Sequence, residues 1–255
     1  MSLLEIKSMT HRFGGLKAVS ELNISIEPGR VEGLIGPNGA GKTTVFNLVS
    51  GFYTPTEGNI IVDGRDTAGL KPHQVTAMGV ARTFQNIRLW KDMTVLDNIR
   101  ISQHHRLGYS FFDAVMRTKR YMKRESEITA EAYKLLEELS LVDFANEYPK
   151  NLPYGTQRKV EIARALSVKP KLLLLDEPAA GLNSSDVVTL INLVKWISEN
   201  FPVTIWMIEH HMDVVMELCS HIVCIDFGET IAEGTPEEIR NNPAVISAYL
   251  GDDNI

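Results

Sequence analysis

The sequence predicts an α/β fold built on a mostly parallel sheet, with an N-terminal antiparallel β part and an inserted helical subdomain. Three observations carry this prediction. Short continuous apolar runs alternate with helical segments over residues 171–234, which is typical of parallel strands covered on both faces. Residues 21–27 alternate apolar and polar side chains, as a half-buried strand does. Over residues 86–153 strand signals disappear and apolar residues take helical spacing.

The first part of the chain divides into short elements separated by turn residues. The expected strands and helices lie, in order, at residues 21–27, 29–35, 42–51, 59–62 and 72–79. Gly51 is placed to cap the first helix, and Asp63-Gly64 ends the third strand. Pro72 suits the first turn of the second helix, because its missing N–H would be unpaired there anyway.

The middle of the chain has helical patterns only. They occupy residues 94–105, 111–124 and 128–141. In the last of these, Leu135, Leu136 and Leu139 recur at helical spacing. With 255 residues, we expect one domain, 1–255. In it, a core of residues 1–85 and 160–255 holds a helical subdomain at residues 86–159.

Charge and hydropathy restrict the partners. The formal net charge of -6 argues against nucleic acid. Residues 117–124 are basic, which suits a membrane surface or nucleic acid, but Glu125, Glu127 and Glu131 follow and favour a solvated helix face. No apolar run approaches the roughly 18 residues that span a bilayer, and the start has no signal-peptide pattern. We therefore expect a cytosolic chain whose membrane role comes through a partner.

The two cysteines, Cys219 and Cys224, form no disulfide framework. His210, His211 and His221 lie nearby in the sequence, so a metal site is conceivable. The spacing fits no metal-binding signature, and small buried thiols are common in protein cores. We interpret both cysteines as core residues.

Residues 36–44, GPNGAGKTT, fit the motif G-x-x-x-x-G-K-[ST] in full. They follow a predicted strand and open a helix, which is the context this motif requires. Its glycines let successive N–H groups face phosphates, and the helix N-terminus adds favourable partial charge. Lys42 should reach the β- and γ-phosphates, and Thr43 should place its hydroxyl on Mg²⁺. The motif predicts nucleotide binding without saying what the nucleotide is used for.

Residues 172–178, LLLLDEP, form an apolar strand that ends in two carboxylates. Asp176 suits Mg²⁺, directly or through water, and Glu177 suits the role of polarising an attacking water. Taken alone, the pair is equally well explained as an acidic turn. Together with the phosphate loop, adjacent carboxylates favour hydrolysis over transfer to a second substrate.

Three further candidates are individually weak. Phe13 precedes the first core strands and could stack on adenine, although a core position explains it as well. Gln85 lies where the sheet gives way to the helical insertion, and a lone glutamine is usually a surface residue. His210 follows an apolar strand and could touch the γ-phosphate, but a lone histidine is more often structural.

The order of the candidate residues and motifs along the chain, and their occurrence together, resolve these ambiguities. These features occur in the same order as in ATP-binding cassette (ABC) ATPases, and the resemblance covers nearly the whole chain. In chain order they are Phe13, the phosphate loop, Gln85, the turn at residues 151–157 (NLPYGTQ), the Asp176-Glu177 pair and His210. Within that superfamily the chain resembles the first of two ATPase subunits of bacterial branched-chain (hydrophobic) amino acid uptake transporters. The stretches that carry this finer resemblance are residues 12–23, 36–58, 79–90 and 233–251.

The resemblance implies ATP and Mg²⁺ as cofactors, a RecA-like core and a signature subdomain. It implies catalytic roles for Glu177 as general base, His210 as γ-phosphate switch and Gln85, which would couple magnesium and water to the membrane partner. It places Mg²⁺ at Thr43, Gln85 and Asp176. The nucleotide-binding residues it implies are Phe13, Gly36, Asn38, Gly39, Ala40, Gly41, Lys42, Thr43, Thr44, Tyr154, Gly155 and Thr156.

The turn at residues 151–157 departs from the family pattern. The usual Leu-Ser-Gly-Gly-Gln aligns with residues 152–156, so proline replaces the serine at Pro153 and tyrosine replaces a glycine at Tyr154. The N–H groups of Tyr154, Gly155 and Thr156 remain, with a helix beginning near Thr156, whereas Pro153 can donate nothing. We expect a signature loop that can still face a γ-phosphate with fewer donors. Asn183 stands where the family often has aspartate.

We therefore expect an ABC-type ATPase subunit that powers import through transmembrane permease subunits. Its expected place is the cytoplasmic face of the cell membrane, and its expected ATPase partner is a second, different subunit or another copy. Residues 86–100, with Leu89 and Trp90, are the candidate groove for the permease; burial of Trp90 in the helical subdomain explains it equally well. Three alternatives are an ABC ATPase for lipopolysaccharide extraction or another solute, a P-loop small-molecule kinase, and a nucleotide-gated module without turnover.

Overall fold

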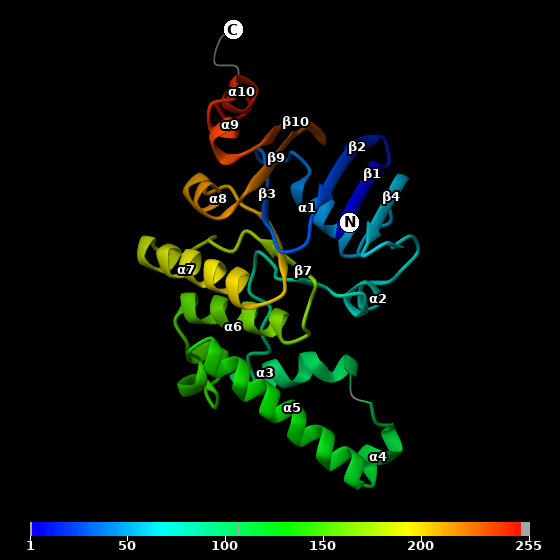
Figure 1. The fold of residues 1–255 in the computed structure, drawn as a ribbon, viewed down its shortest axis with the longest axis vertical. Coiled ribbons are helices and arrows are strands. Elements are labelled where there is room, and N and C mark those ends of the chain that lie inside the picture. The colour runs from blue at the N-terminus through cyan, green and yellow to red at the C-terminus, as the bar shows by residue number, and fades with distance from the viewer. Residues whose placement is uncertain (1, 107, 251–255) are drawn as a thin grey trace. The chain divides into compact units, whose positions relative to one another are not determined.

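The computed structural model describes residues 2–106 and 108–250 (Figure 1). The chain forms two compact units, a core unit of residues 1–85 and 171–255 and a helical unit of residues 86–170. The second boundary thus falls at 170/171, where the sequence placed it at 159/160. The reason is that α6 (Tyr154–Leu166) continues through the expected boundary without a break, and pairing to the core resumes only where the Lys171 N–H meets the Gly79 carbonyl, at 2.8 Å.

The first sheet of the core unit is entirely antiparallel. Its strand order is β2-β1-β4-β5. Ile6 lies opposite Ile24 on one side and Ile60 on the other, so apolar residues line up across the sheet. The strands are β1 (Leu4–Phe13), β2 (Leu16–Ile26), β4 (Glu57–Val62) and β5 (Arg65–Asp66).

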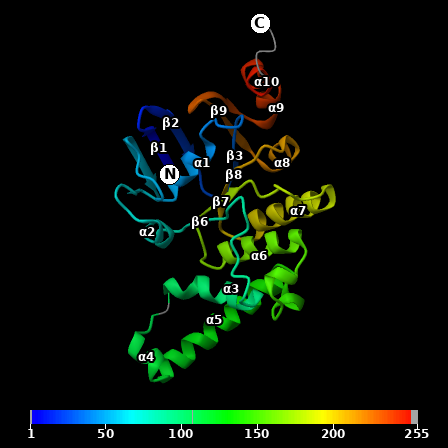
Figure 2. The same cartoon turned by 180° about the vertical axis from the view of Figure 1, so that it is seen from behind.

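The second sheet is mostly parallel, with the order β10-β9-β3-β8-β7-β6 (Figure 2). Only the β9–β10 hairpin is antiparallel. Its strands are β3 (Val31–Ile35), β6 (Val80–Arg82), β7 (Leu172–Asp176), β8 (Thr204–Ile208), β9 (His221–Asp226) and β10 (Glu229–Gly234). Every residue of β7 and β8 is buried, as continuous apolar runs predict. The predicted fold class is therefore confirmed.

The helices of the core unit pack their apolar residues on these sheets. They are α1 (Lys42–Val49), α2 (Pro72–Ala77), α7 (Ser184–Asn200), α8 (Met212–Leu218), α9 (Pro236–Arg240) and α10 (Pro243–Leu250). The ring of Phe46 on α1 lies 4.9 Å from that of Trp206 on β8, centroid to centroid. Cys219 and Cys224 are buried, and burial raises the pKa of each thiol to about 12, so both behave as core residues.

The helical unit contains four α-helices and three short 3-10 helices among its described residues. They are α3 (Val95–Ser102), η1 (Gln103–Arg106), α4 (Phe111–Val115), α5 (Lys119–Glu138), η2 (Val142–Phe144), η3 (Pro149–Asn151) and α6 (Tyr154–Leu166). The helical pattern over residues 111–124 is broken into α4 and α5, because Arg117 takes a left-handed conformation with φ +48°. Trp90 is 48% exposed, which rules out the alternative that it is buried in the helical subdomain, whereas Leu89 is buried.

None of the helices within residues 2–106 and 108–250 has both the length and the hydropathy needed to cross a bilayer.

Candidate nucleotide site

The loop between β3 and α1 has a backbone that glycine alone adopts without strain. Gly39 and Gly41 have φ of +83° and +101°. A Cβ on Gly41 would lie 2.5 Å from the Ala18 carbonyl oxygen, and one on Gly36 would lie 2.1 Å from that of Ile225. Side chains at these positions would push the loop off β2 and β9, so the glycine spacing is a packing requirement as well as a conformational one.

Lys42 turns back over this loop from the first position of α1. Its Nζ donates to the carbonyl oxygens of Gly36, at 2.7 Å, and Pro37, at 2.9 Å. The side chain is buried, and burial lowers its pKa, although the nearby charge of Glu177 opposes the shift. The Lys42 ammonium therefore lies beside the loop on which the phosphates of a nucleotide would bind.

Two further contacts shape the loop. Gly41 caps α1 and no side chain bonds to the first N–H groups of this helix, which leaves its positive end open to an anion. The N–H of Gly36 donates to the hydroxyl of Tyr249 on α10, at 2.9 Å. Burial raises the pKa of Tyr249 to about 12, so this hydroxyl stays neutral.

Asp176, the predicted metal ligand at the end of β7, is held by a buried arginine. Its Oδ2 accepts from Arg82 Nη2 at 2.6 Å, and both side chains are nearly fully buried. Arg82 also donates to Asn47 Oδ1, at 2.8 Å, and its guanidinium lies 5.2 Å from the centre of the Phe84 ring. Arg82 therefore fixes one carboxylate oxygen of Asp176 and leaves the other, Oδ1, free of this contact.

Glu177 meets both of the other predicted catalytic side chains. Gln85 Nε2 donates to Glu177 Oε2 at 2.7 Å, and His210 Nδ1 lies 3.6 Å from the same oxygen. Glu177 itself has φ +46°, an uncommon conformation for a non-glycine residue, and its N–H donates to the Ile208 carbonyl of β8. The structure thus brings Gln85, Glu177 and His210 together around one carboxylate oxygen.

A further carboxylate, that of the buried Glu209, holds the backbone around this cluster. It is fully buried, and it accepts from backbone N–H groups alone. Its Oε1 takes the Ala179 N–H at 2.7 Å, and its Oε2 takes those of His210 and His211 at 3.1 and 3.2 Å. Glu209 therefore ties the end of β8 to the turn that follows Glu177, which fixes the chain on both sides of the Glu177–His210 contact.

Phe13 ends β1 as part of a surface aromatic cluster. It is 45% exposed, which does not fit a core position. Its ring meets His11 edge-on at 4.6 Å and Tyr53 edge-on at 5.4 Å, while His11 and Tyr53 stack on each other. Phe13 thus lies at the surface beside two other aromatic rings.

The turn at residues 151–157 lies in the helical unit and is described by itself. α6 begins at Tyr154, two residues before the expected start near Thr156, with Pro153 as the capping residue and no side-chain cap. The Gln157 amide Nε2 donates to the Leu152 carbonyl at 2.9 Å and closes the turn. The first N–H groups of α6, including those of Gly155 and Thr156, therefore remain open to an anion.

Within the same unit, α6 is bonded to the segment that follows Gln85. The buried Glu161 accepts from Arg158 at 2.7 Å and from the backbone N–H of Arg88 at 3.1 Å. Burial raises the pKa of Glu161, while these contacts oppose the shift. Arg164 donates to the Arg88 carbonyl, and its guanidinium lies 5.4 Å from the Trp90 ring.

Sequence reasoning missed Arg82, Glu209, Tyr249 and Glu161 as supports of the site. None lies in a spaced motif, and each acts through a contact that only the tertiary structure makes. The one available signal was a charged side chain inside or next to an apolar strand, as at Arg82 and Glu209.

A glycine loop between a buried strand and a helix, with paired carboxylates at the end of another strand of the same sheet, defines a P-loop nucleoside triphosphatase. Comparison with known proteins narrows the class. The chain belongs to the ABC transporter family: a family model described as "ABC transporter" matches residues 19–180. A second model, "Branched-chain amino acid ATP-binding cassette transporter", matches residues 229–254.

Curated relatives and solved structures agree with this assignment. The chain is 46% identical over 250 residues to the high-affinity branched-chain amino acid transport ATP-binding protein BraF of Pseudomonas aeruginosa, covering 98% of each. It is 44% identical over the same length, with the same coverage, to LivG of Escherichia coli. A crystal structure of a nucleotide-free ATP-binding cassette from an ABC transporter superposes with a TM-score of 0.85 at 33% identity, covering 98% of this chain and 100% of that one. The resemblance to ABC ATPases is confirmed.

Proposed function

We propose that the chain is the ATP-hydrolysing subunit of a membrane importer for branched-chain or other hydrophobic amino acids. The observation that carries the hydrolytic part is the cluster in which Gln85 and His210 meet Glu177, beside Asp176. Such a cluster suits the activation of a water molecule. The named transport function of the relatives supports the cargo, as does the match of residues 229–254 to a branched-chain amino acid model.

ATP binds, in this proposal, with its phosphates on backbone N–H groups of residues 38–44 and its adenine on Phe13. Lys42 exchanges its two loop carbonyls for β- and γ-phosphate oxygens, because a buried ammonium gains more from an anion than from neutral acceptors. The open start of α1 adds favourable partial charge. The exposed aromatic cluster around Phe13 supports the adenine position.

The residues predicted for Mg²⁺ fit that ion by their donor chemistry. Thr43 supplies a hydroxyl, Gln85 a side-chain amide oxygen, and Asp176 the carboxylate oxygen that Arg82 leaves free. Hard oxygen donors of this kind suit Mg²⁺, which would neutralise charge on the β- and γ-phosphates when bound. Arg82 meanwhile holds the other carboxylate oxygen of Asp176 in a buried ion pair.

Hydrolysis follows from the geometry around Glu177. Its carboxylate orients a water and takes a proton from it as the water oxygen bonds to the γ-phosphorus and the bond to ADP breaks. His210, 3.6 Å from Glu177, is placed to contact the γ-phosphate and to report its loss. Glu209 holds the backbone N–H groups of Ala179 and His210, and so fixes the chain next to both catalytic side chains.

The proposed assembly is a head-to-tail pair of ATPase subunits beneath a permease. One solved relative, 25% identical with a TM-score of 0.76, is a dimeric ATP-binding cassette bound to ADP and Pi. In such a pair, the turn at residues 151–157 of each chain would face the other chain's nucleotide. The partner is a second, different ATPase subunit or another copy, and nucleic acid has no part. The chain would then lie on the cytoplasmic face of the cell membrane, held by the permease at residues 86–100, where Trp90 is exposed.

Glu177→Gln tests the proposal in the reconstituted transporter. Loss of a general base should slow phosphate release by roughly 10²–10⁴-fold, with ATP affinity retained. ATP-driven uptake of labelled leucine into proteoliposomes should fall in parallel. Glu199→Gln, an exposed carboxylate at the end of α7, is the matched control and should behave as wild type. Turnover above half of wild type in Glu177→Gln would contradict the catalytic assignment. Phosphate release with no leucine uptake would contradict the cargo alone.

A further inference from the structure

The helix α4 carries an apolar face that packs on nothing in the described chain. Phe111, Phe112, Val115 and Met116 occupy positions i, i+1, i+4 and i+5, which share one side of a helix. No residue of α4 is buried. The α4 patch, as we call it, consists of five side chains with their exposed fractions: Phe111 86%, Phe112 69%, Val115 62%, Met116 60% and Met122 56%.

These side chains do not hold α4 in place. The helix is fixed by polar contacts at its start, where Ser110 and Asp113 form a capping box. Asp113 Oδ1 also accepts from Thr118 Oγ1 at 2.9 Å, across the turn into α5. Because the fold gains little from the two phenylalanines, their exposure points to a contact outside the chain.

A group of cations borders the α4 patch. Arg117, Lys119, Arg120 and Lys123 are all exposed. Across the described residues, Arg117, Lys119 and Arg120 have no carboxylate within 4.0 Å, and Lys123 has only Glu127, at 3.9 Å. The acidic residues that follow this stretch pair mainly with other cations: Glu125 with Arg100 at 3.0 Å, Glu127 with Arg124 at 3.2 Å, and Glu131 with Lys169 at 2.8 Å. The cations next to the patch remain available, in a chain whose net charge is -6.

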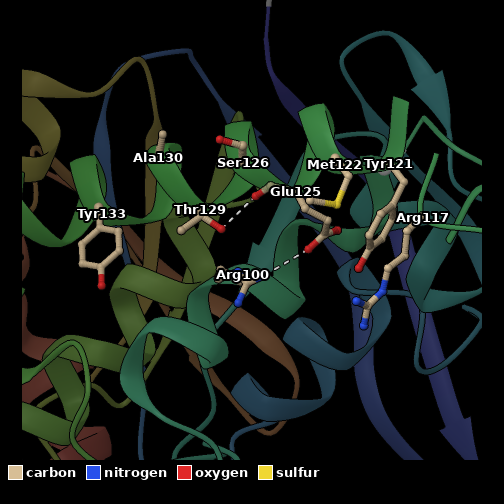
Figure 3. A pocket seen from close by; sticks show the side chains of 9 residues that line it. All are labelled: Arg100, Arg117, Tyr121, Met122, Glu125, Ser126, Thr129, Ala130 and Tyr133. Atoms are coloured by element: carbon tan, nitrogen blue, oxygen red, sulfur yellow. Dashed lines mark hydrogen bonds and ion pairs between the residues drawn. The ribbon is translucent and has the colours of Figure 1, made fainter. Parts of the chain in front are cut away.

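The patch continues into an open hollow of about 620 Å³ on the surface of α3 and α5. Figure 3 shows Met122 and Arg117 at the same end of this hollow, with Arg117 extended beside Tyr121. An exposed apolar side chain and an exposed cationic one thus lie at the same end of the hollow.

We propose that the α4 patch and its bordering cations contact the anionic surface of a lipid bilayer. Exposed aromatic and aliphatic side chains on one helix face, next to lysine and arginine, are the composition of helices that lie in the headgroup region. The phenylalanines would enter the boundary between headgroups and acyl chains, and the cations would meet lipid phosphates. A protein partner is the other occupant, and the experiment below distinguishes it from a lipid surface. This contact would be additional to the one through a permease.

Vesicle binding by the purified full chain tests this inference. We expect sedimentation with vesicles of phosphatidylglycerol and phosphatidylcholine, weak sedimentation with phosphatidylcholine alone, and loss of binding at 0.5 M salt, about the ionic strength at which surface charges are screened. The double change Lys119→Glu and Arg120→Glu should weaken binding by roughly 30-fold or more, from about 1 kcal/mol per cation near such a surface. The fold should be kept, because both positions lie in the first turn of α5, where acidic residues are favourable.

Phe111→Ser with Phe112→Ser should weaken vesicle binding by roughly tenfold or more, because burying a phenylalanine contributes about 1.5–3 kcal/mol. Two controls should bind as wild type: Phe227→Ser, an 85% exposed phenylalanine in the core unit, and Lys134→Glu on α5. ATP hydrolysis should be unchanged in all variants, so a failure here leaves the proposed function standing. Equal binding to neutral and anionic vesicles, or unchanged binding in the double variants, would overturn the inference. So would a wild type that ignores vesicles while the variants lose assembly with the permease, which would make the patch a protein docking surface.

Discussion

At the scale of single residues, the site depends on buried charged side chains that form ion pairs with each other. Arg82 and Asp176 illustrate the point, because each is nearly fully buried and each is the other's ion partner. Asp176 could be predicted from its place at the end of an apolar strand. Arg82 could not, because it lies 94 residues earlier in the chain and meets Asp176 only when β6 pairs with β7.

Arg82→Leu should destabilise the chain by roughly 3–5 kcal/mol, because it leaves a buried carboxylate without its partner. Urea unfolding measures this loss. Arg12→Leu, at an exposed position of β1, is the control. Arg82→Lys keeps a positive charge and should recover part of the stability. If it is no more stable than Arg82→Leu, Arg82 acts through packing on Phe84 and Phe46 and not through charge.

At the scale of elements, the turn at residues 151–157 shows how a helix start can replace a specific side chain. Proline at the capping position offers no hydroxyl, and no other side chain caps α6. The N–H groups of the first turn are nevertheless present. The departure from the usual signature was visible in the sequence, but the start of α6 at Tyr154 was not, because tyrosine after proline carries no helix signal.

Changing Pro153→Ser and Tyr154→Gly together should raise ATP turnover of the chain assayed alone. The serine would restore a hydroxyl that both caps α6 and can donate to a γ-phosphate across a dimer, and each neutral hydrogen bond is worth about 1 kcal/mol, more when it meets a charge. We expect an increase of roughly fivefold or more in phosphate release at equal protein concentration. Pro153→Ala with Tyr154→Gly is the matched control, because it lacks the hydroxyl. If both double variants match wild type, the helix start alone suffices and Pro153 and Tyr154 only shape the turn.

Elements with strong periodicity were predictable, and short or interrupted ones were not. The buried strands β7 and β8 follow from continuous apolar runs. The strand β6 was missed because its three residues are too few to show a pattern. The break between α4 and α5 was missed because Arg117 gives no sign of a positive φ. Such a conformation is set by the hydrogen bonds around Asp113, which are not visible as a spacing.

At the scale of the whole molecule, the order of motifs along the chain predicted the family, whereas the supports between motifs could not be predicted. Gln85, Glu177 and His210 are separated by at least 33 residues from one another, yet they follow β6, β7 and β8, which pair side by side and bring them to one edge of the sheet. Parallel strands place their carboxyl ends together, which is why a linear list of motifs becomes a cluster. No contact among the described residues identifies the cargo, so the assignment of the cargo rests on similarity to the relatives.

The pH dependence of global stability should have a component from Glu32 on β3. Burial raises the pKa of this carboxyl to about 7, although the charge of Arg30 opposes the shift. Because the folded pKa lies above the unfolded value of about 4.5, the stabilising effect is complete below pH 4.5 and is lost as pH rises through 7. His221 Nδ1, on the neighbouring strand β9, lies 3.9 Å from Glu32 Oε2.

Glu32→Gln should therefore stabilise the chain at pH 8 by roughly 2–3 kcal/mol, at about 1.4 kcal/mol for each pKa unit, and should have little effect at pH 4.5. Urea midpoints across this pH range measure the difference. Glu57→Gln, at an exposed position of β4, should leave the curve nearly unchanged. A variant that is destabilised equally at all pH values would show that Glu32 acts through packing and hydrogen bonding and not through its ionisation.

The hydroxyl of Tyr249 on α10 holds the first amide of the phosphate loop from a point 213 residues further along the chain. The practical consequence concerns how the protein is handled. A tag fused close to α10, or a shortened form made to help crystallisation, would alter the loop that grips the nucleotide while leaving every recognised motif intact. Nucleotide affinities measured on such forms would describe the altered loop, and labels are better attached away from this helix.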